Sequence, residues 1–377
     1  MIRRLYVHNF RCLENFELRL ANQPSVLLIG SNGSGKTTVR LALEVLQKIA
    51  RGTNRVGALV KPKDFFLGRT DAPMRFEIEV ELQGTIYQYT IAFELPRGFR
   101  ELRVLEENLV SGGQPVYTRN QAQVRLARAG RLAEQEANFR MDWHQVALPI
   151  VQESPNNPLF IFKQWLARML ILQPIPSLIK GESTGETLEP NVDAVNFAAW
   201  FSGLLASTPA AYARIDEYLK GVMPDMRNIR NPVIGRESRS LFVSFLVHML
   251  SSPPTTSELE VPFEDLSDGE KCFMICALVL AASDANEQPF CFWDEPDSHL
   301  ALSEIGHFVV ALRKAFQSGG QFLMTSHNPE AIRRFSDENT LVLMRRSHLE
   351  PAVVRPLGEL QVKGDLVGAL IQGDVEA

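Results

Sequence analysis

The segment that most constrains this chain is Gly30–Thr37, which reads GSNGSGKT and matches the pattern G-x-x-x-x-G-K-[ST] in full. It follows the short apolar run Ser25–Ile29 and precedes Thr37–Ala50, where apolar residues recur at helical spacing. A buried strand, a glycine-rich turn and a helix in this order predict the start of a βαβ unit. The chain is therefore predicted to be an α/β protein with a parallel strand buried on both faces.

The residue types in this loop suit a polyphosphate. Glycines let the backbone turn tightly and point several N–H groups at phosphate oxygens, and the helix N-terminus adds partial positive charge. Lys36 can reach the β- and γ-phosphates, and the Thr37 hydroxyl can ligate Mg²⁺. The alternative is a glycine-rich turn with an exposed lysine. The predicted nucleotide-binding residues are Gly30, Ser31, Asn32, Gly33, Ser34, Gly35, Lys36, Thr37 and Thr38.

A second motif, Pro289–Pro296, is an apolar run that ends in two acids, Asp294 and Glu295. A buried parallel strand would deliver both carboxylates to its C-terminal end, where ligands bind in open α/β sheets. Asp294 suits Mg²⁺, and Glu295 suits the general base that activates water. An exposed acidic turn is the alternative.

Two further motifs follow the same pattern of a polar turn beside an apolar element. Leu266–Lys271 reads LSDGEK and precedes the apolar run Cys272–Ala282, so Ser267 is a helix N-cap candidate and can also contact an anion. Met324–Pro329 ends an apolar strand in a turn that bears His327, a natural contact for a γ-phosphate.

The remaining chain offers weaker signals. Leu5–Phe10 and Phe16–Leu20 predict two strands, and residues 75–95 predict an antiparallel hairpin. The arginine-rich segment 97–140 is expected to be solvated surface, with a basic contact face as the alternative. Arg3, Arg4 and Arg11 are expected to be solvated, with a contact to phosphate as the alternative.

The middle of the chain is expected to contain several helices. Leu159–Leu172 is predicted as one helix, residues 192–222 as two helices, and Ser251–Glu260 as a linker. Cys272, Cys276 and Cys291 are predicted to be small buried hydrophobes, with metal ligation as the alternative.

Composition limits the class of protein. The chain has 377 residues, a formal charge of -5, 45% hydrophobic residues and four cysteines, which is typical of a globular protein in a reducing cytosol. Charged residues interrupt the opening segment, so no secretory signal is predicted, and no apolar run approaches the ~20 residues that span a bilayer. The mild overall acidity argues against a large nucleic-acid footprint.

Together, GSNGSGKTT, LSDGEK, FCFWDEPDSHL and MTSHNPE resemble the head of an ABC-type ATPase of the SMC/RecF-like branch, which includes OLD-like proteins. The opening IRRLYVHNFRCLENFEL is similar to the first strands of this branch, and LSDGEK differs from the LSGGQ of transporters. The resemblance is strong over about residues 1–50 and 260–335.

The resemblance implies roles for the matching residues. Asp294 would be the Walker B acid, Glu295 the catalytic base and His327 the switch histidine, with ATP as substrate and Mg²⁺ as the metal. Ser267 and Gly269 would face ATP bound by a second subunit, which implies a homodimer with composite sites. Asp297 would lie in the loop between active sites, whereas the family's Q-loop glutamine is not located: Gln83 and Gln88 both lie in a plausible region.

The expected architecture is a bilobed α/β head with a mixed P-loop sheet, an antiparallel β-subdomain and a helical insertion. The motifs divide it into an N-terminal half over 1–96, a β/helical insertion and lid region over 97–260, and a C-terminal half over 261–377.

The expected function is ATP hydrolysis by a cytoplasmic dimer that acts on DNA in repair or in anti-phage defence. The alternative is an ATP-bound sensor or scaffold that holds a separate effector protein, because the chain carries no visible effector motif. A transporter subunit is disfavoured by the signature and the long middle segment. No membrane partner is expected.

Overall fold

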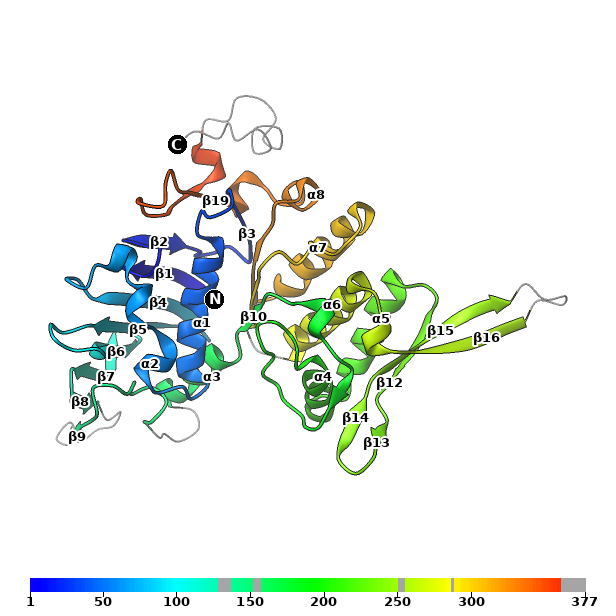
Figure 1. Ribbon diagram of the computed structural model, residues 1–377, viewed down its shortest axis with the longest axis horizontal. Helices are drawn as coiled ribbons and strands as arrows, with labels where there is room; N and C mark the ends of the chain where they lie inside the picture. The colour runs from blue at the N-terminus through cyan, green and yellow to red at the C-terminus, as the bar shows by residue number, and fades with distance from the viewer. Residues whose placement is uncertain (128–136, 152–156, 250–254, 286–287, 361–377) are drawn as a thin grey trace. The chain divides into compact units, whose positions relative to one another are not determined.

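A computed structural model describes residues 1–127, 137–151, 157–249, 255–285 and 288–360 (Figure 1). Contacts divide the chain into two compact units, Met1–Met169 with Ser336–Ala377, and Leu170–Phe335. Both units combine helices and sheets, which confirms the predicted α/β class. The division at residues 96 and 260 follows the order of the motifs and stays a prediction.

The first unit contains an eight-stranded antiparallel sheet in the order β2-β1-β4-β5-β6-β7-β8-β9. Its strands are β1 (Ile2–His8), β2 (Phe16–Arg19), β4 (Met74–Leu82), β5 (Thr85–Glu94), β6 (Arg103–Ser111), β7 (Gln114–Asn120), β8 (Gln123–Leu126) and β9 (Ala137–Arg140). The two opening strands and the hairpin at 75–95 are therefore confirmed. The period-2 alternation along β4 buries every second residue, so one face of the sheet is apolar.

Helices cover the apolar face of this sheet. Phe162 of α3 (Pro158–Ala167) stacks on Tyr87 with 6.0 Å between ring centroids and contacts Tyr89 at 5.5 Å. Helix α3 also packs against α1 (Lys36–Ala50), whose Gln47 side chain donates a hydrogen bond to the carbonyl of Met169. The short helix α2 (Val56–Leu59) follows α1.

Over its described residues, 97–127 and 137–140, the arginine-rich segment continues the sheet, and Arg119 departs from the expected solvation. Arg119 is buried and donates hydrogen bonds to the carbonyls of Gln121 (2.6 Å) and Asp142 (3.0 Å). Its partner Glu107, also buried, accepts from the backbone N–H groups of Ala147 (2.7 Å) and Leu148 (2.9 Å). This pair fixes the segment that follows β9, because a buried carboxylate and guanidinium both need hydrogen-bond partners.

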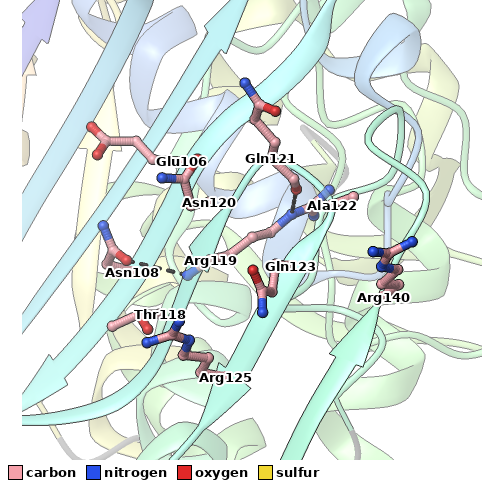
Figure 2. A pocket seen from close by; sticks show the side chains of 10 residues that line it. All are labelled: Glu106, Asn108, Thr118, Arg119, Asn120, Gln121, Ala122, Gln123, Arg125 and Arg140. Carbon is pink, nitrogen blue, oxygen red and sulfur yellow. Dashed lines mark hydrogen bonds between the residues drawn. The ribbon is translucent and has the colours of Figure 1, made fainter.

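The outer face of β6–β9 carries amides and arginines around a cleft of about 620 Å³ (Figure 2). Cross-strand pairing aligns Asn120 with Gln123 and Gln123 with Arg140, and it aligns Thr118 with Arg125. No acidic partner of Arg125 or Arg140 is found among the residues that the structure describes. The polar surface at this end of the sheet is therefore locally basic.

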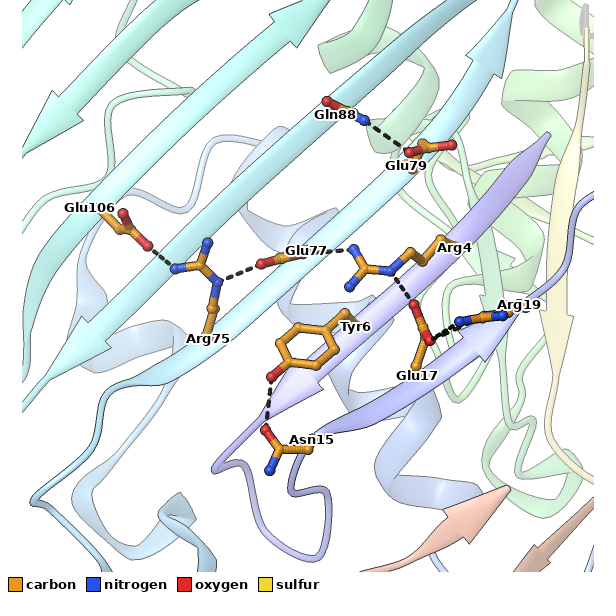
Figure 3. A network of polar contacts seen from close by, with 10 residues as sticks. All are labelled: Arg4, Tyr6, Asn15, Glu17, Arg19, Arg75, Glu77, Glu79, Gln88 and Glu106. Carbon is orange, nitrogen blue, oxygen red and sulfur yellow. Dashed lines mark hydrogen bonds and ion pairs between the residues drawn. The ribbon is translucent and has the colours of Figure 1, made fainter. Parts of the chain in front are cut away.

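A ladder of ion pairs crosses the other strands on the outer face (Figure 3). Arg4 joins Glu17 (2.5 Å) to Glu77 (2.7 Å), and Arg75 joins Glu77 (2.5 Å) to Glu106. Burial alone would raise the pKa of Glu77, but the pairs with Arg4 and Arg75 outweigh it and hold the pKa below its ordinary value. Arg3 pairs with Glu79 and Glu81 as well, so the opening arginines are engaged rather than freely solvated.

A second sheet segment in the first unit is mixed. Strand β3 (Ser25–Ile29) is fully buried and runs parallel to β19 (Thr340–Met344), which pairs antiparallel with β20 (Val353–Pro356). The predicted helix after the glycine-rich loop is α1. These elements confirm the strand–loop–helix reading of residues 25–50.

The second unit contains the parallel strands β10 (Leu170–Leu172), β17 (Phe290–Trp293) and β18 (Gln321–Thr325). Its helices are α4 (Phe197–Ser207), α5 (Ala211–Val222), α6 (Asp268–Ala285), α7 (Leu302–Phe316) and α8 (Pro329–Ile332). The predicted helix over 159–172 is wrong at its end: α3 stops at Ala167 and residues 170–172 form a strand. A short apolar run is compatible with a helix as well as with a buried strand, and residues 170–172 form a strand because they pair in parallel with β17.

Small antiparallel sheets complete this unit. One comprises β12 (Met226–Arg230), β15 (Phe242–Met249) and β16 (Thr255–Pro262), and the other β11 (Glu182–Ser183), β13 (Val233–Ile234) and β14 (Ser238–Ser240). The predicted linker at 251–260 is therefore wrong from Thr255 onward, where threonine and valine favour a strand; residues 251–254 lie outside the described residues.

The helices that the structure describes include none with both the length and the apolar character needed to cross a bilayer.

Candidate functional site

The phosphate loop in the first unit is shaped by glycines that no other residue replaces without strain. A Cβ on Gly30, whose φ is 154°, would lie 2.3 Å from the carbonyl oxygen of Leu343. Gly35, with φ 114°, caps α1, and a Cβ there would lie 3.1 Å from the Cys12 sulfur. Side chains at these positions would fill the loop, so the sequence needs glycine for the backbone to curl.

Polar groups converge on this loop. The Lys36 ammonium donates to the carbonyls of Gly30 (2.7 Å) and Ser31 (3.2 Å). The Ser34 hydroxyl is buried and has no hydrogen-bond partner among the described residues, whereas Thr37 is exposed on the first turn of α1. A lysine, an orphaned hydroxyl and a helix N-terminus around a curled backbone fit a polyphosphate.

The second unit carries the acidic group of residues at the C-terminal end of β17. Asp294 is buried, and its Oδ1 accepts a hydrogen bond of 2.6 Å from the Thr325 hydroxyl of β18. The same hydroxyl accepts a hydrogen bond of 2.9 Å from the N–H of Glu295. Thr325 thus connects the two acids, and parallel pairing of β17 with β18 places it beside them.

Glu295 has a left-handed backbone, with φ 50°, which is uncommon for a residue other than glycine or asparagine. Its Oε1 lies 3.5 Å from Nε2 of His327, and both side chains are nearly half exposed. The turn after β17 therefore presents this carboxylate outward next to an imidazole. A strained backbone like that of Glu295 is typical of positions where function fixes a side chain.

The residues after the two acids are also tied to β18. Asp297 is buried and accepts a hydrogen bond of 2.6 Å from the Ser326 hydroxyl. Burial raises the pKa of the Asp297 carboxyl, and the hydrogen bond from Ser326 opposes this shift. Thr325, Ser326 and His327 are consecutive, so one strand end contacts Asp294, Asp297 and Glu295 in turn.

Sequence reasoning missed Gln173. It directly follows β10, the neighbour of β17, and lines a cavity of about 370 Å³ together with Asp294, Glu295 and His299. The signal was present, because a polar residue after an apolar triplet is what the end of a buried parallel strand predicts. The two glutamines considered earlier lie elsewhere: Gln83 is in the turn between β4 and β5, and Gln88 donates to Glu79 on the outer sheet face (Figure 3).

The LSDGEK segment forms the predicted capping box at the start of α6. The Ser267 N–H donates to Glu270 (2.7 Å), and the Glu270 N–H donates to the Ser267 hydroxyl (3.3 Å). A Cβ on Gly269 would lie 3.2 Å from the carbonyl of His299, so the helix start packs closely on the segment after β17. Asp268 also lies 3.7 Å from the His299 ring.

The predicted site residues thus form two groups, one in each unit, and each group is brought together. Residues 30–38 form a continuous loop and helix start in the first unit. In the second unit, Asp294, Glu295 and His327 lie at the ends of β17 and β18, and Ser267 and Gly269 lie at the start of α6, where Gly269 approaches the carbonyl of His299. The roles given to them stay predictions.

The cysteines are all free and buried. Burial raises the pKa of Cys272 to about 12, so it is a thiol at neutral pH. No group of three or more His, Cys, Asp or Glu side chains suited to hold a metal ion occurs within the described part of the chain.

Comparison with known proteins accounts for this set of motifs. The model of the RecF/RecN/SMC N-terminal domain matches residues 1–350, which is most of the chain. The chain belongs to this family. It is thus an SMC/RecF-like ATPase by family, as the resemblance predicted, and nucleotide binding is the family's shared property.

Matches to individual relatives of the SMC/RecF family are short. A chromosome partition protein Smc from Chlorobaculum tepidum is 35% identical over 69 residues, covering 18% of this chain and 6% of that protein. An OLD nuclease from Thermus scotoductus is 46% identical over 46 residues, covering 12% of this chain and 8% of that protein. The chain therefore matches less than a tenth of the length of these relatives.

Solved SMC heads share the fold over nearly the whole chain. An Smc head bound to the C-terminal winged-helix domain of ScpA has a TM-score of 0.56 at 15% identity and covers 94% of this chain and 98% of its own. A Pyrococcus furiosus Smc head with an extended coiled coil, bound to the C-terminal domain of ScpA, has a TM-score of 0.52 at 13% identity, covering 95% and 97%. The predicted head fold is confirmed.

Proposed function

We propose that this protein binds Mg-ATP and hydrolyses it. The observation that carries the proposal is the group at the end of β17: a buried aspartate, a strained and outward-facing glutamate, and a histidine whose Nε2 lies 3.5 Å from the glutamate. A base beside an imidazole, in a chain that also has a phosphate loop, suits attack of water on a γ-phosphate.

In the first unit, the chemistry is binding. The N–H groups of the loop and the Lys36 ammonium bind phosphate oxygens, and the Thr37 hydroxyl would hold the metal. Mg²⁺, when bound, neutralises charge on the phosphates. In forming these contacts Lys36 exchanges the carbonyls of Gly30 and Ser31 for phosphate oxygens.

In the second unit, the residues activate the attacking water. Asp294 would help to hold the metal, and Glu295 accepts the proton of the attacking water. His327 contacts the γ-phosphate and keeps the Glu295 carboxylate in place. Gln173, in the same cavity as both acids, is suited to hold the water or the metal by its amide.

We further propose a homodimer in which Ser267 and Gly269 of one chain contact ATP bound by the other. Both lie at the start of α6, where the helix N-terminus favours an anion. The test is nucleotide-dependent dimerisation measured by light scattering. Glu295→Gln should accumulate a dimer with ATP, and Lys36→Ala should stay monomeric. A variant Glu295→Gln that stays monomeric with saturating ATP would refute the composite site.

We place this activity in the cytoplasm, in DNA repair or anti-phage defence. The specific support for DNA is the basic cleft over β6–β9, where Arg125, Arg140 and amides can contact phosphates without reading bases (Figure 2). Fluorescence anisotropy with duplex DNA at several salt concentrations tests this. Arg125→Gln with Arg140→Gln should weaken binding and flatten its salt dependence, and Arg19→Gln, from the paired ladder, should not.

The alternative is a sensor whose ATP-bound form holds a separate effector protein. Its support is the share of the chain in β6–β9 and β11–β16 that carries none of the ATPase motifs. Absence of salt-dependent DNA binding, together with a co-purifying nuclease or toxin, would favour it over a direct action on DNA.

A further inference from the structure

A turn beside the phosphate loop has no role in the proposed hydrolysis. Strands β3 and β19 are parallel neighbours, with Ile29 opposite Val342. Their C-terminal ends therefore meet at the same edge, where ligands of α/β sheets bind. The phosphate loop follows β3, and the turn of residues 345–350, called here the β19–β20 turn, follows β19.

Contacts along the loop show how closely this hairpin lines it. A Cβ on Gly30 would meet the carbonyl of Leu343, and a Cβ on Gly35 would lie 3.2 Å from Cβ of Ala352. Between them, a Cβ on Gly33 would lie 3.8 Å from Cε1 of His348, so the imidazole ring is in van der Waals range of the loop's tip.

Arg345 gives the turn a fixed shape. Its guanidinium donates to the carbonyls of Glu350 (2.9 Å) and His348 (2.7 Å), and its Nη1 lies 3.3 Å from Nδ1 of His348. An arginine only donates, so Nδ1 is the acceptor and the ring hydrogen is on Nε2. No partner of Nε2 is found in the described part of the chain, which leaves this donor available next to Gly33.

The turn also exposes an apolar side chain. Leu349 is 75% exposed, the highest value among the large hydrophobic residues described. The end of the same hairpin is joined to Cys12: the N–H of Ala352 donates to the Cys12 carbonyl (2.8 Å), and the buried Cys12 S–H donates to the Thr38 hydroxyl. The β19–β20 turn thus offers a flat ring, a ring N–H donor and an exposed apolar side chain beside the loop.

We propose that the β19–β20 turn binds the nucleoside end of the triphosphate, with His348 and Leu349 against the base and Arg345 as the positioning residue. This inference rests on the proposed ATP binding. The phosphate loop has donors for phosphates and nothing flat or apolar for a base, whereas an imidazole and a leucine suit stacking and a ring N–H suits a base nitrogen.

The test compares ATP with inorganic tripolyphosphate, which has the phosphates and no nucleoside. Binding of each is measured by calorimetry to the wild type, to His348→Ala with Leu349→Ser, and to Arg345→Ala. The double variant should lower the affinity for ATP about tenfold or more, since base stacking contributes on that order. It should leave the affinity for tripolyphosphate within about twofold of the wild type. Arg345→Ala should show the same selectivity to a smaller extent.

Two controls distinguish failure of the nucleoside site from failure of nucleotide binding as a whole. Ile86→Ser removes another exposed hydrophobic residue of the same unit and should change neither affinity. Unchanged ATP affinity in the double variant, or equal weakening of ATP and tripolyphosphate, overturns the inference alone. If the wild type binds neither ligand, the proposed nucleotide binding fails first, and Lys36→Ala sets the level expected for that case.

Discussion

The hydroxyl of Thr325 joins the two acids of the proposed active site, so its removal tests how the site is held together. Thr325→Val keeps the shape of the side chain and removes the donor to Asp294 and the acceptor of the Glu295 N–H. Thr325 is fully buried, and so is its bond to Asp294, whereas the bond from the Glu295 N–H is partly buried.

The magnitude follows from the two bonds. A hydrogen bond to a carboxylate contributes about 1.5–3 kcal/mol, and an N–H left without a partner costs about 1–3 kcal/mol. Because the Glu295 N–H is only partly buried, urea unfolding should show a loss in the lower part of the summed range, about 2.5–4 kcal/mol, which is a large share of a typical domain's stability. Because Glu295 has a left-handed backbone that Thr325 helps to hold, the hydrolysis rate should fall on the order of 100-fold while ATP affinity changes little.

The matched control is Thr325→Ser, which retains the hydroxyl and loses only a methyl group. It should stay within about 1.5 kcal/mol of the wild type and keep most of the activity. If Thr325→Val hydrolyses ATP as fast as Thr325→Ser does, the hydroxyl does not position the base, and this reasoning is refuted.

The remaining predictions concern the phosphate loop and the sheet of the first unit. Lys36→Ala should abolish ATP binding in calorimetry, because it removes the cation that the loop offers to the phosphates, and retained affinity would contradict this role. The variant should keep its fold, because the bonds of the ammonium are to the carbonyls of Gly30 and Ser31 in the loop. Arg119→Met should destabilise the protein by about 3–5 kcal/mol in urea unfolding, since it leaves Glu107 buried without its cation; a change below about 1 kcal/mol would contradict the contribution assigned to the pair. The pKa of Glu77 is held below its ordinary 4.5, so its stabilisation is present above pH 4.5 and is lost as pH falls through the lower folded value. Wild-type unfolding free energy should thus drop more steeply than that of Glu77→Gln as pH falls to about 3, and equal slopes would show that the ladder does not contribute.

The elements that carry motifs were predictable because each has a strong local signal. Ser25–Ile29 is apolar throughout and precedes glycines, and Phe290–Trp293 is apolar and precedes two acids, so strand ends and site residues followed from the same pattern. The capping box of Ser267 and Glu270 was likewise readable, since its partners are three residues apart.

The features that sequence reasoning missed depend on contacts between distant segments. Leu170–Leu172 continues a helical pattern and becomes a strand only because it pairs with β17, and this concealed Gln173. The burial of Arg119 needs carbonyls from a segment after β9, which no local pattern encodes. The approach of His348 to Gly33 arises from the pairing of β3 with β19, more than three hundred positions along the chain.

The central claim, hydrolysis of ATP with Glu295 as the base, is tested most directly by the rate of phosphate release at saturating Mg-ATP from the wild type and from Glu295→Gln. The variant preserves the size of the side chain and the N–H bonded to Thr325, and it removes only the proton acceptor. The account predicts release by the wild type and a loss on the order of 100-fold or more in Glu295→Gln with ATP still bound. Equal rates in the two proteins would contradict it.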